Sequence, residues 1–220
     1  MKDFDQIPGV DFTESFAPMA NDMTLCTMLV ITLMYAAGEW NVEVIDIETA
    51  FMEADLKEEV WIEIPDGYEF AFGEIDQVRY VMLLLKAMFG LVHAPRAFYE
   101  TFRKILTSAD IGMLQSKVHP CMFYTQDGSG RLMALMVIHV DDCVIAGKKS
   151  TEEEIKKASA KRLSIKDEGR LSKHLGVWYE WNADGGLTMH QKDIIADIIT
   201  RRSSEIAENF LHQGTQGSVY

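Results

Sequence analysis

The sequence predicts an α+β domain built on an antiparallel sheet. Short alternating runs such as "EVWIEI" are followed by turn residues, here "PDG", as is typical of β-hairpins. A long apolar run over 132–147 contains a turn of its own, and helical patterns lie between the strands without a regular βαβα order. With 220 residues, of which 48% are hydrophobic, the chain can bury a core as one domain or as two packed subdomains.

The first half of the chain begins with irregular structure over residues 1–20, where Pro and Gly interrupt any periodicity. A buried helix is expected over 21–38, because its uncharged stretch is shorter than the roughly 20 apolar residues that cross a bilayer. A β-branched strand follows at 42–48, and "TAFMEADL" has the pattern of a helical turn. The alternating run at 59–64 and a partner at 78–83 then predict a hairpin.

The second half of the chain contains the strongest helical pattern, over 94–111, with a proline in its first turn. A short strand is expected at 121–125, before the apolar hairpin at 132–147. The run 150–163 has acids in its first turn and basic residues later, as the helix dipole favours. "HLGVWYEWNADGGLTMH" predicts a last hairpin with its turn at "ADGG", and a final helix is expected over 191–202.

Composition limits the classes of function. The 34 acidic and 21 basic residues give a net charge of −13, which disfavours tight non-specific attraction to nucleic acid. Three cysteines are too few for a disulfide framework or a zinc site, so reduced thiols in an intracellular, cytoplasmic protein are the simplest interpretation. The N-terminal residues contain no apolar segment of the signal-peptide type.

Two adjacent carboxylates, Asp141 and Asp142, lie at the centre of the apolar hairpin. A buried carboxylate needs a cationic partner or loses its charge, and no Lys or Arg occurs between Arg131 and Lys148. One interpretation is that the two residues only form the turn, since Asp is a common turn residue. The other is that the turn faces a cleft in which Mg²⁺, which prefers carboxylate oxygen, supplies the missing charge.

The second interpretation requires a third acid, and Asp46 at the end of "VEVID" is the candidate. If this strand lies antiparallel beside the hairpin, carboxylates from strands about 4.8 Å apart can converge on one site. Such a site could share two metal ions roughly 3.5–4 Å apart, the arrangement that nucleotidyl transfer uses.

Six blocks of the sequence, in order over residues 9–202, give the chain a family resemblance. They are "GVDFTESFAP", "VIDIETAFMEADLKEEVWIEIPDGY", "LLLKAMFGLVHAPRAFYETF", "HVDDCVIAG", "IKDEGRLSKHLGV" and "GGLTMHQKDIIADII". In these blocks the chain resembles the reverse transcriptase of copia-type retrotransposons. The resemblance implies a right-hand polymerase palm with partial fingers and no thumb over 1–205, and a divergent C-terminal tail over 206–220. It also implies RNA-directed DNA synthesis from deoxynucleoside triphosphates.

The resemblance assigns roles to individual residues. Asp46 and Asp141 would be the principal ligands of two Mg²⁺ ions, with Mn²⁺ as an alternative, and Asp142 the neighbouring catalytic acid and metal ligand. Substrate contacts would come from the backbone after the first acid, an aromatic ring that excludes a 2′-hydroxyl, a glycine below the template and primer, and a lysine that protonates pyrophosphate. These residues are Ile47, Glu48, Thr49, Ala50, Phe51, Gly90 and Lys166. Without the resemblance, Phe51 reads as a core residue and Lys166 as a solvated surface charge.

The implied partners are an RNA template, a DNA primer, deoxynucleoside triphosphates and the remaining Pol polyprotein with integrase and ribonuclease H, in a virus-like particle and without a membrane. Some positions depart from the family. His139 replaces the usual aromatic residue before the acid pair, Glu48 replaces a lysine, and Val92 and His93 replace a lysine and a glutamine. The family's basic fingers strand is expected upstream of "GVDFTESFAP".

Two functions therefore stay open. The chain is either a magnesium-dependent polymerase domain or a catalytically degenerate palm remnant that keeps its acids. A phosphoacceptor receiver domain also gathers acids at strand ends, but its acid pair belongs near the first strand of a parallel sheet, whereas this pair lies late and in a hairpin.

Overall fold

The computed structural model forms two compact units, a larger unit Met1–Arg170 and a smaller unit Leu171–Tyr220. It describes residues 6–10, 12–35, 40–68, 70, 73 and 80–214, with side chains up to residue 203. Parts of several predicted segments lie outside the described residues, namely 1–5, 36–38, 78–79 and the end of the tail, 215–220. Within the described residues, every helix is too short or too polar to span a membrane.

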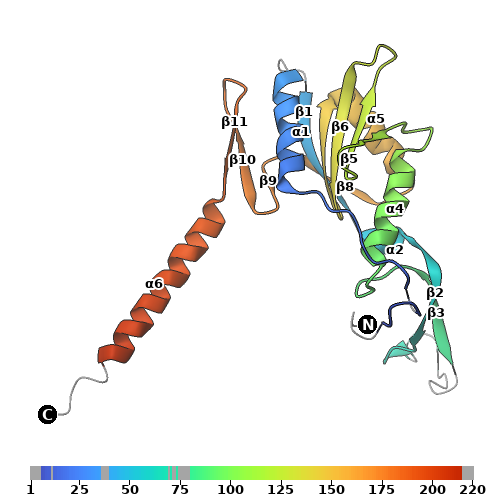
Figure 1. Ribbon diagram of the computed structural model, residues 1–220, viewed down its shortest axis with the longest axis horizontal. Coiled ribbons are helices and arrows are strands. Elements are labelled where there is room, and N and C mark those ends of the chain that lie inside the picture. The colour runs from blue at the N-terminus through green and yellow to red at the C-terminus, as the bar shows by residue number, and fades with distance from the viewer. Residues whose placement is uncertain are drawn as a thin grey trace. The chain divides into compact units, whose positions relative to one another are not determined.

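The larger unit is built on a six-stranded sheet in which every neighbouring pair is antiparallel, in the order β4-β5-β6-β7-β1-β8 (Figure 1). The strands are β1 (Trp40–Ile47), β4 (Leu114–Gln115), β5 (Met122–Gln126), β6 (Leu132–His139), β7 (Asp142–Lys148) and β8 (Ile165–Arg170). The predicted antiparallel α+β class is confirmed. The apolar run predicted as a hairpin forms β6 and β7 at the centre of the sheet, where both strand faces are buried.

Helices cover both faces of this sheet (Figure 1). On one face, α1 (Asp22–Tyr35) packs against β6 and β7. On the other face, α4 (Ala94–Leu106) and α5 (Lys149–Ser159) enclose the main core. Strand residues alternate between the two sides, so β1 directs Val42 and Val44 away from this main core and Ile45 into it.

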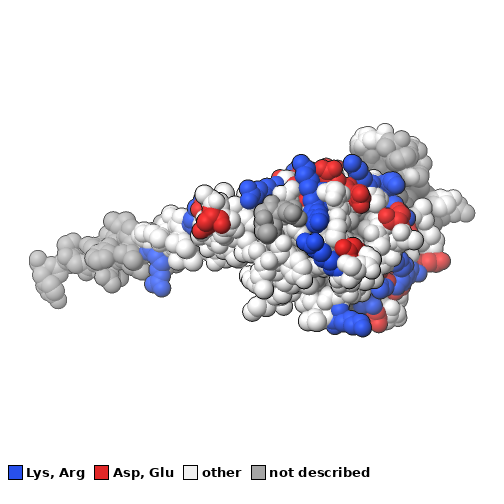
Figure 2. Space-filling view, turned by 90° about the horizontal axis from the view of Figure 1, so that it is seen from above, with Lys and Arg blue, Asp and Glu red and all other residues white. Residues whose placement is uncertain are grey.

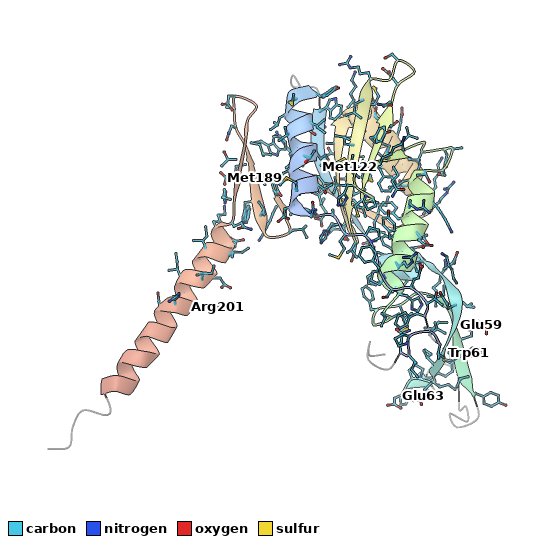
Figure 3. All side chains as sticks on the ribbon, viewed as in Figure 1. Glu59, Trp61, Glu63, Met122, Met189 and Arg201 are labelled. Atoms are coloured by element: carbon cyan, nitrogen blue, oxygen red, sulfur yellow. The ribbon has the colours of Figure 1, made fainter. Side chains whose placement is uncertain are left out.

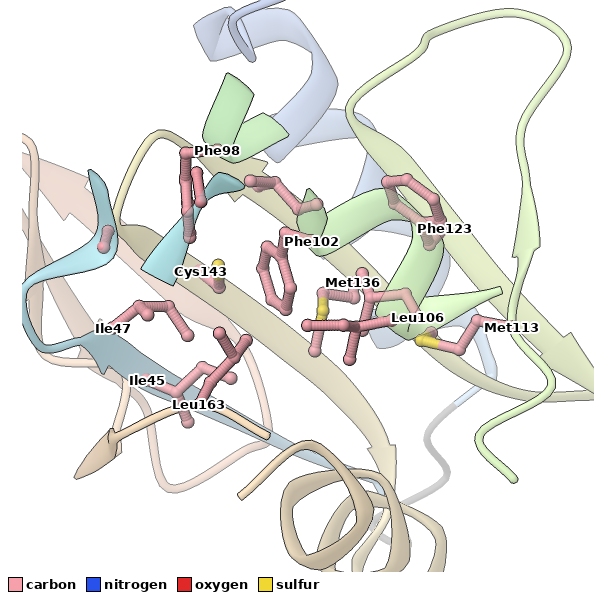
Figure 4. Packing of buried hydrophobic residues seen from close by; sticks show 14 of the residues in the cluster. Ile45, Ile47, Phe98, Phe102, Leu106, Met113, Phe123, Met136, Cys143 and Leu163 are labelled. Carbon is pink, nitrogen blue, oxygen red and sulfur yellow. The ribbon is translucent and has the colours of Figure 1, made fainter. Parts of the chain in front are cut away.

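The main core combines aromatic rings of α4 with branched and sulfur-containing side chains of the central strands. Phe98 and Phe102 stack with ring centroids 5.7 Å apart and pack with Ile45, Met136 and Cys143 (Figure 4). These side chains are essentially inaccessible to water, and burying each large one stabilises the fold by about 1.5–3 kcal/mol. The core therefore holds β1 rigidly against the β6–β7 hairpin.

A second hairpin, β2 (Asp55–Glu63) and β3 (Val81–Lys86), forms a separate two-stranded sheet. The expected pairing is confirmed, although β2 begins four residues earlier than the predicted 59–64. The helical turn expected in "TAFMEADL" is α2 (Ala50–Glu53), which ends because Ala54 is already extended at φ −87° and ψ 131°. The chain then enters β2 at once.

The predicted helix over 94–111 ends earlier, at Leu106. The hydroxyl groups of Thr107 and Ser108 donate hydrogen bonds to the backbone carbonyls of Arg103 and Ile105, which closes the last turn. In the smaller unit, β9 (Lys173–His174), β10 (Val177–Trp181) and β11 (Leu187–His190) form an antiparallel sheet, confirming the last predicted hairpin. The final helix, α6 (Lys192–Gly214), is longer than the predicted 191–202.

Candidate active site

Two of the three predicted acids lie directly opposite each other. Asp46 at the end of β1 pairs in register with Asp142 at the start of β7, which confirms the expected antiparallel pairing of the two segments. The register continues to both sides, with His139 of β6 opposite Asp142 and Lys166 of β8 opposite Asp46. Because residues directly opposite in antiparallel strands project from the same face, these four side chains form one row across the sheet.

The third acid, Asp141, lies in the two-residue turn between β6 and β7. Its neighbour Val140 has φ 58°, a left-handed conformation that is rare for a β-branched residue and costs about 1–3 kcal/mol. The backbone carbonyl of Asp141 accepts a hydrogen bond of 3.1 Å from the amide of Ile47. This bond ties the strained turn to the end of β1, next to Asp46.

The three acids raise one another's pKa values. Burial is the largest cause for each, and Glu168 and Asp141 further raise the pKa of Asp46. The carboxylates of Asp46 and Glu168 likewise raise the pKa of Asp142, and Asp142 raises that of Asp141. Against this, Lys166 lowers the pKa of Asp46, and His139 lowers the pKa values of Asp141 and Asp142. In the part of the chain that the structure describes, none of the three forms an ion pair with Lys, Arg or His.

Carboxylate oxygens in this setting have the donor chemistry that a hard divalent cation prefers. The described residues nevertheless contain no group of three His, Cys, Asp or Glu side chains close enough together to hold a metal ion. The structure thus places two acids face to face and a third in the adjoining turn, without closing a three-ligand site. A cation seated there would require these side chains to move closer together.

The segment expected to contact substrate follows Asp46 directly. Glu48 bonds to Ser164 twice: its amide donates to the Ser164 carbonyl at 3.0 Å, and its carboxylate accepts from the Ser164 hydroxyl at 2.6 Å. Thr49 adopts φ 52° and precedes α2, whose first residue Ala50 is buried. The chain therefore leaves the strand and enters a short helix just beyond the acid.

Phe51 packs against Phe89, the residue that precedes Gly90. The rings of Phe51 and Phe89 meet edge to face with centroids 4.9 Å apart, and Phe51 also touches the Phe98 ring at 6.4 Å. Gly90 has φ 89°, which a residue with a side chain rarely adopts. Phe51 is therefore a half-buried ring at the edge of the main core.

Lys166 projects from the same row as Asp46 but is paired elsewhere. Its ammonium group lies 3.0 Å from Glu168, and that hydrogen bond, with the charge of Glu168, raises the pKa of Lys166. Glu168 was not predicted from the sequence. Its spacing of two residues from Lys166 would have indicated a shared side, had 165–170 been recognised as a strand.

His139 was noted only as a departure from the family, and the structure gives it a contact. Its Nδ1 lies 3.1 Å from the backbone carbonyl of Ala20, just before α1, so the ring donates from the Nδ1–H. The two residues are 119 positions apart, and no sequence pattern could have paired them. The bond fastens the end of β6 to the segment that leads into α1.

Nearly all of the described region matches a known family. The family described as "Reverse transcriptase (RNA-dependent DNA polymerase)" matches residues 1–211. Similar proteins include the Retrovirus-related Pol polyprotein from transposon TNT 1-94 of Nicotiana tabacum, 32% identical over 80% of this chain and 13% of that protein. The Pol polyprotein from transposon RE1 of Arabidopsis thaliana is 30% identical over 91% of this chain and 13% of its own length.

A putative transposon Ty5-1 protein of Saccharomyces cerevisiae is 26% identical over 69% of this chain and 47% of its own length. No solved structure matches the chain. The chain thus spans about 13% of the length of the plant polyproteins that it resembles. It belongs to the reverse transcriptase (RNA-dependent DNA polymerase) family, as a domain of the copia-type transposon Pol polyprotein.

Proposed function

We propose that this domain catalyses RNA-directed DNA synthesis, adding deoxynucleoside triphosphates to the 3′-hydroxyl of a primer. The observation that carries the proposal is the register of Asp46 opposite Asp142, with Asp141 in the adjoining strained turn. These acids form no ion pair among the described residues, in a family whose members are RNA-dependent DNA polymerases. We assign 1–205 to the palm with partial fingers and 206–220 to a divergent tail.

Each residue then has a defined task. Asp46, Asp141 and Asp142 hold two Mg²⁺ ions, or Mn²⁺, once their side chains move closer together. When bound, these ions favour ionisation of the primer hydroxyl and offset the charge of the triphosphate. Lys166 protonates the departing pyrophosphate, a role supported by its place opposite Asp46 and by the charged form that Glu168 favours.

The nucleotide itself is held by the chain that follows Asp46. The backbone of Ile47, Glu48, Thr49 and Ala50 lies against the triphosphate, and Phe51 leaves no room for a 2′-hydroxyl. Support for this gate comes from the contacts with Phe89 and Phe98, which fix the ring in place. Gly90 lies beneath the template and primer, where its missing side chain allows close approach.

The macromolecular partners are an RNA template and a DNA primer, within a polyprotein that also carries integrase and ribonuclease H. Cations on the larger unit do not gather in one continuous patch on the face seen in Figure 2, where Lys and Arg alternate with Asp and Glu. With a net charge of −13, the domain would gain little from non-specific attraction to phosphate. Neighbouring parts of the polyprotein would then supply much of the grip on nucleic acid.

A second candidate function is a catalytically degenerate palm remnant. The observation in its favour is that no three-ligand metal group is formed among the described side chains. Under this second proposal the domain has the fold of the family but does not catalyse DNA synthesis.

Primer extension separates the two candidates. The complete chain is incubated with a primed RNA template, deoxynucleoside triphosphates and Mg²⁺, and compared with Asp141→Asn. The control is Asp184→Asn, an equal charge change in an exposed turn of the smaller unit. Extension by the wild type and the control but not by Asp141→Asn supports the polymerase. Folded proteins that all fail to extend the primer support the remnant.

A further inference from the structure

The outer side of the β2–β3 hairpin carries an apolar surface that the polymerase function does not use. Strand β3 reads Val-Met-Leu-Leu-Leu before Lys86, a continuous apolar run of the kind found in strands that are covered on both faces. Only its inward residues are covered, with Leu84 packed on the main core. The outward residues Val81, Leu83 and Leu85 are 58%, 38% and 77% exposed.

Strand β2 continues this surface. Trp61 lies directly opposite Leu83 in the hairpin register and is 53% exposed. Glu59 and Glu63 lie two residues from Trp61 on either side, and the alternating burial of β2 exposes all three. These residues are labelled in Figure 3. The outer hairpin face is thus an apolar centre bordered by acids: Glu59, Trp61, Glu63, Val81, Leu83 and Leu85.

The charges near these two acids are paired elsewhere in the part of the hairpin that the structure describes. Nearby Lys57 is paired with Glu100, and Lys86 with Asp55 at 2.7 Å. Among the described residues, no Lys or Arg forms an ion pair with Glu59 or Glu63. An exposed apolar patch with unbalanced acids at its border is typical of an interaction site, not of a solvated surface.

The charges decide between kinds of partner. Glu59 and Glu63 would repel the phosphates of nucleic acid and of anionic lipid. A second copy related by a two-fold axis would bring the same acids against each other, in a chain that already carries a net charge of −13. A polypeptide with apolar side chains between Lys or Arg residues satisfies both features, because its cations can reach the acids and the Trp61 ring.

We propose that the outer hairpin face is a docking site for a basic, apolar polypeptide segment of a partner protein. The segment places aliphatic side chains on Leu83, Leu85 and Val81 and sets its cations beside Glu59 and Glu63. Docking is independent of nucleotide chemistry, so it holds whether or not the domain extends a primer.

The test is fluorescence anisotropy of labelled peptides added to the complete chain. The probe is a short peptide of alternating Lys and Leu, with Glu-Leu and Lys-Ser peptides of equal length as comparators. Only the Lys-Leu peptide is expected to bind. Leu83→Ser combined with Leu85→Ser should weaken binding about tenfold or more, since a few central apolar anchors carry most of the energy of an interface.

Charge is tested with a matched pair of variants. Glu59→Gln with Glu63→Gln should weaken binding about threefold or more and reduce its salt dependence. Glu153→Gln with Glu154→Gln makes the same charge change on exposed positions of α5 and should leave binding unchanged. Peptide binding should also shift the tryptophan emission of the wild type, and this shift should be lost in Trp61→Phe.

Three outcomes overturn the proposal. Equal weakening by both charge variants means general attraction to an acidic protein, and binding that survives Leu83→Ser with Leu85→Ser means another surface. Sedimentation showing self-association that these two substitutions abolish assigns the face to a second copy. All the altered side chains point away from the core, and a hydrogen-exchange profile equal to that of the wild type verifies that each variant is folded.

Discussion

Strand β1 carries one acid on each of its faces, and the surroundings of the two acids are opposite. Glu43 faces α5, where the ammonium group of Lys156 pairs with it and also lies 2.7 Å from Asp167. Asp46, three residues along, faces Asp142 and forms no ion pair among the described residues, although the charge of Lys166 lowers its pKa. The negative charge of Glu43 is therefore neutralised by a lysine of the same chain, whereas Asp46 forms no such ion pair within the described part of the chain. We take Glu43 as a structural acid and Asp46 as a candidate metal ligand.

The structural side of β1 also contains a buried acid of its own. Glu152 of α5 is 1% exposed, and burial, with the nearby charge of Glu43, raises its pKa to about 8. Lys156 lowers the pKa of Glu152 in turn, so one cation serves three carboxyl groups. This side of the sheet should therefore respond to mutation through stability, and the Asp46 side through activity.

The largest effect is expected at Asp46. Asp46→Asn should reduce primer extension by about 10³-fold or more, equivalent to roughly 4 kcal/mol of barrier, because a metal ligand is lost. Its free energy of unfolding without Mg²⁺ should stay equal to that of the wild type or rise, since one of several repelling acids is removed. The control is Glu43→Gln on the other face of β1, which should lower the free energy of unfolding and leave the rate of primer extension unchanged. If Asp46→Asn unfolded more easily than the wild type but still extended the primer at the same rate, Asp46 would be a structural acid and the prediction would be wrong.

Removal of the balancing cation comes next. Lys156→Met should lower the free energy of unfolding by about 4 kcal/mol, because Glu43, whose side chain is only partly exposed, would lose its cationic partner. Urea denaturation at neutral pH measures this loss. The control is Lys157→Met on the exposed side of the same helix, for which a change within about 0.5 kcal/mol is expected. An equal decrease in the free energy of unfolding for Lys156→Met and Lys157→Met would show that the ion pairs of Lys156 do not stabilise the fold.

The pH dependence of Glu152 gives a somewhat smaller effect. Its folded pKa, about 8, lies above the usual value of 4.5, so the folded state holds the proton more tightly than the unfolded state does. Its contribution to stability is complete below pH 4.5 and is lost as the pH rises toward 8. Relative to Glu152→Gln, which stays neutral, the wild type should lose about 3 kcal/mol between pH 5 and pH 8. If the free energies of unfolding of the wild type and of Glu152→Gln changed with pH in the same way, the raised pKa of Glu152 would be contradicted.

The smallest effect is expected at His139, which fastens β6 to the segment before α1. His139→Phe keeps a ring but removes the donor to the Ala20 carbonyl, and should cost about 1 kcal/mol of stability. His139→Asn places an amide donor near the position of Nδ1 and should recover most of that loss. Hydrogen exchange at the amides of 139–142 should be faster in the first variant than in the second. Identical exchange in both would mean that the bond contributes nothing.

Periodicity predicted the strands that carry or flank the three acids. The apolar run over 132–147 predicted β6 and β7, whose antiparallel pairing follows from the short turn at Asp141. The β-branched run at 42–48 predicted β1, but its pairing with β7 was only a condition for the site and is supplied by the structure. The strand β8 was missed because "IKDEGR" is charged and lacks alternation, although it forms the edge of the sheet beside β1. Edge strands need fewer apolar residues, so their sequences carry a weaker signal.

Contacts between distant segments could not be predicted from any pattern. The bond from His139 to Ala20 joins two irregularly placed positions, and the pairing of Glu43 with Lys156 spans 113 residues. Glu152 resembled an ordinary acid in the first turn of a helix, yet it is turned into the protein. Such contacts depend on how elements pack, which local sequence does not encode.

The most direct test of the contrast along β1 is divalent cation binding in the absence of nucleic acid. Mn²⁺ binding is measured by electron paramagnetic resonance for the wild type, Asp46→Asn and Glu43→Gln. The wild type and Glu43→Gln should bind with similar affinity, and Mg²⁺ at about tenfold its dissociation constant should stabilise both by roughly 1.4 kcal/mol. Asp46→Asn should lose both responses. Undiminished Mn²⁺ binding by Asp46→Asn, or none by the wild type at millimolar concentration, would contradict the account.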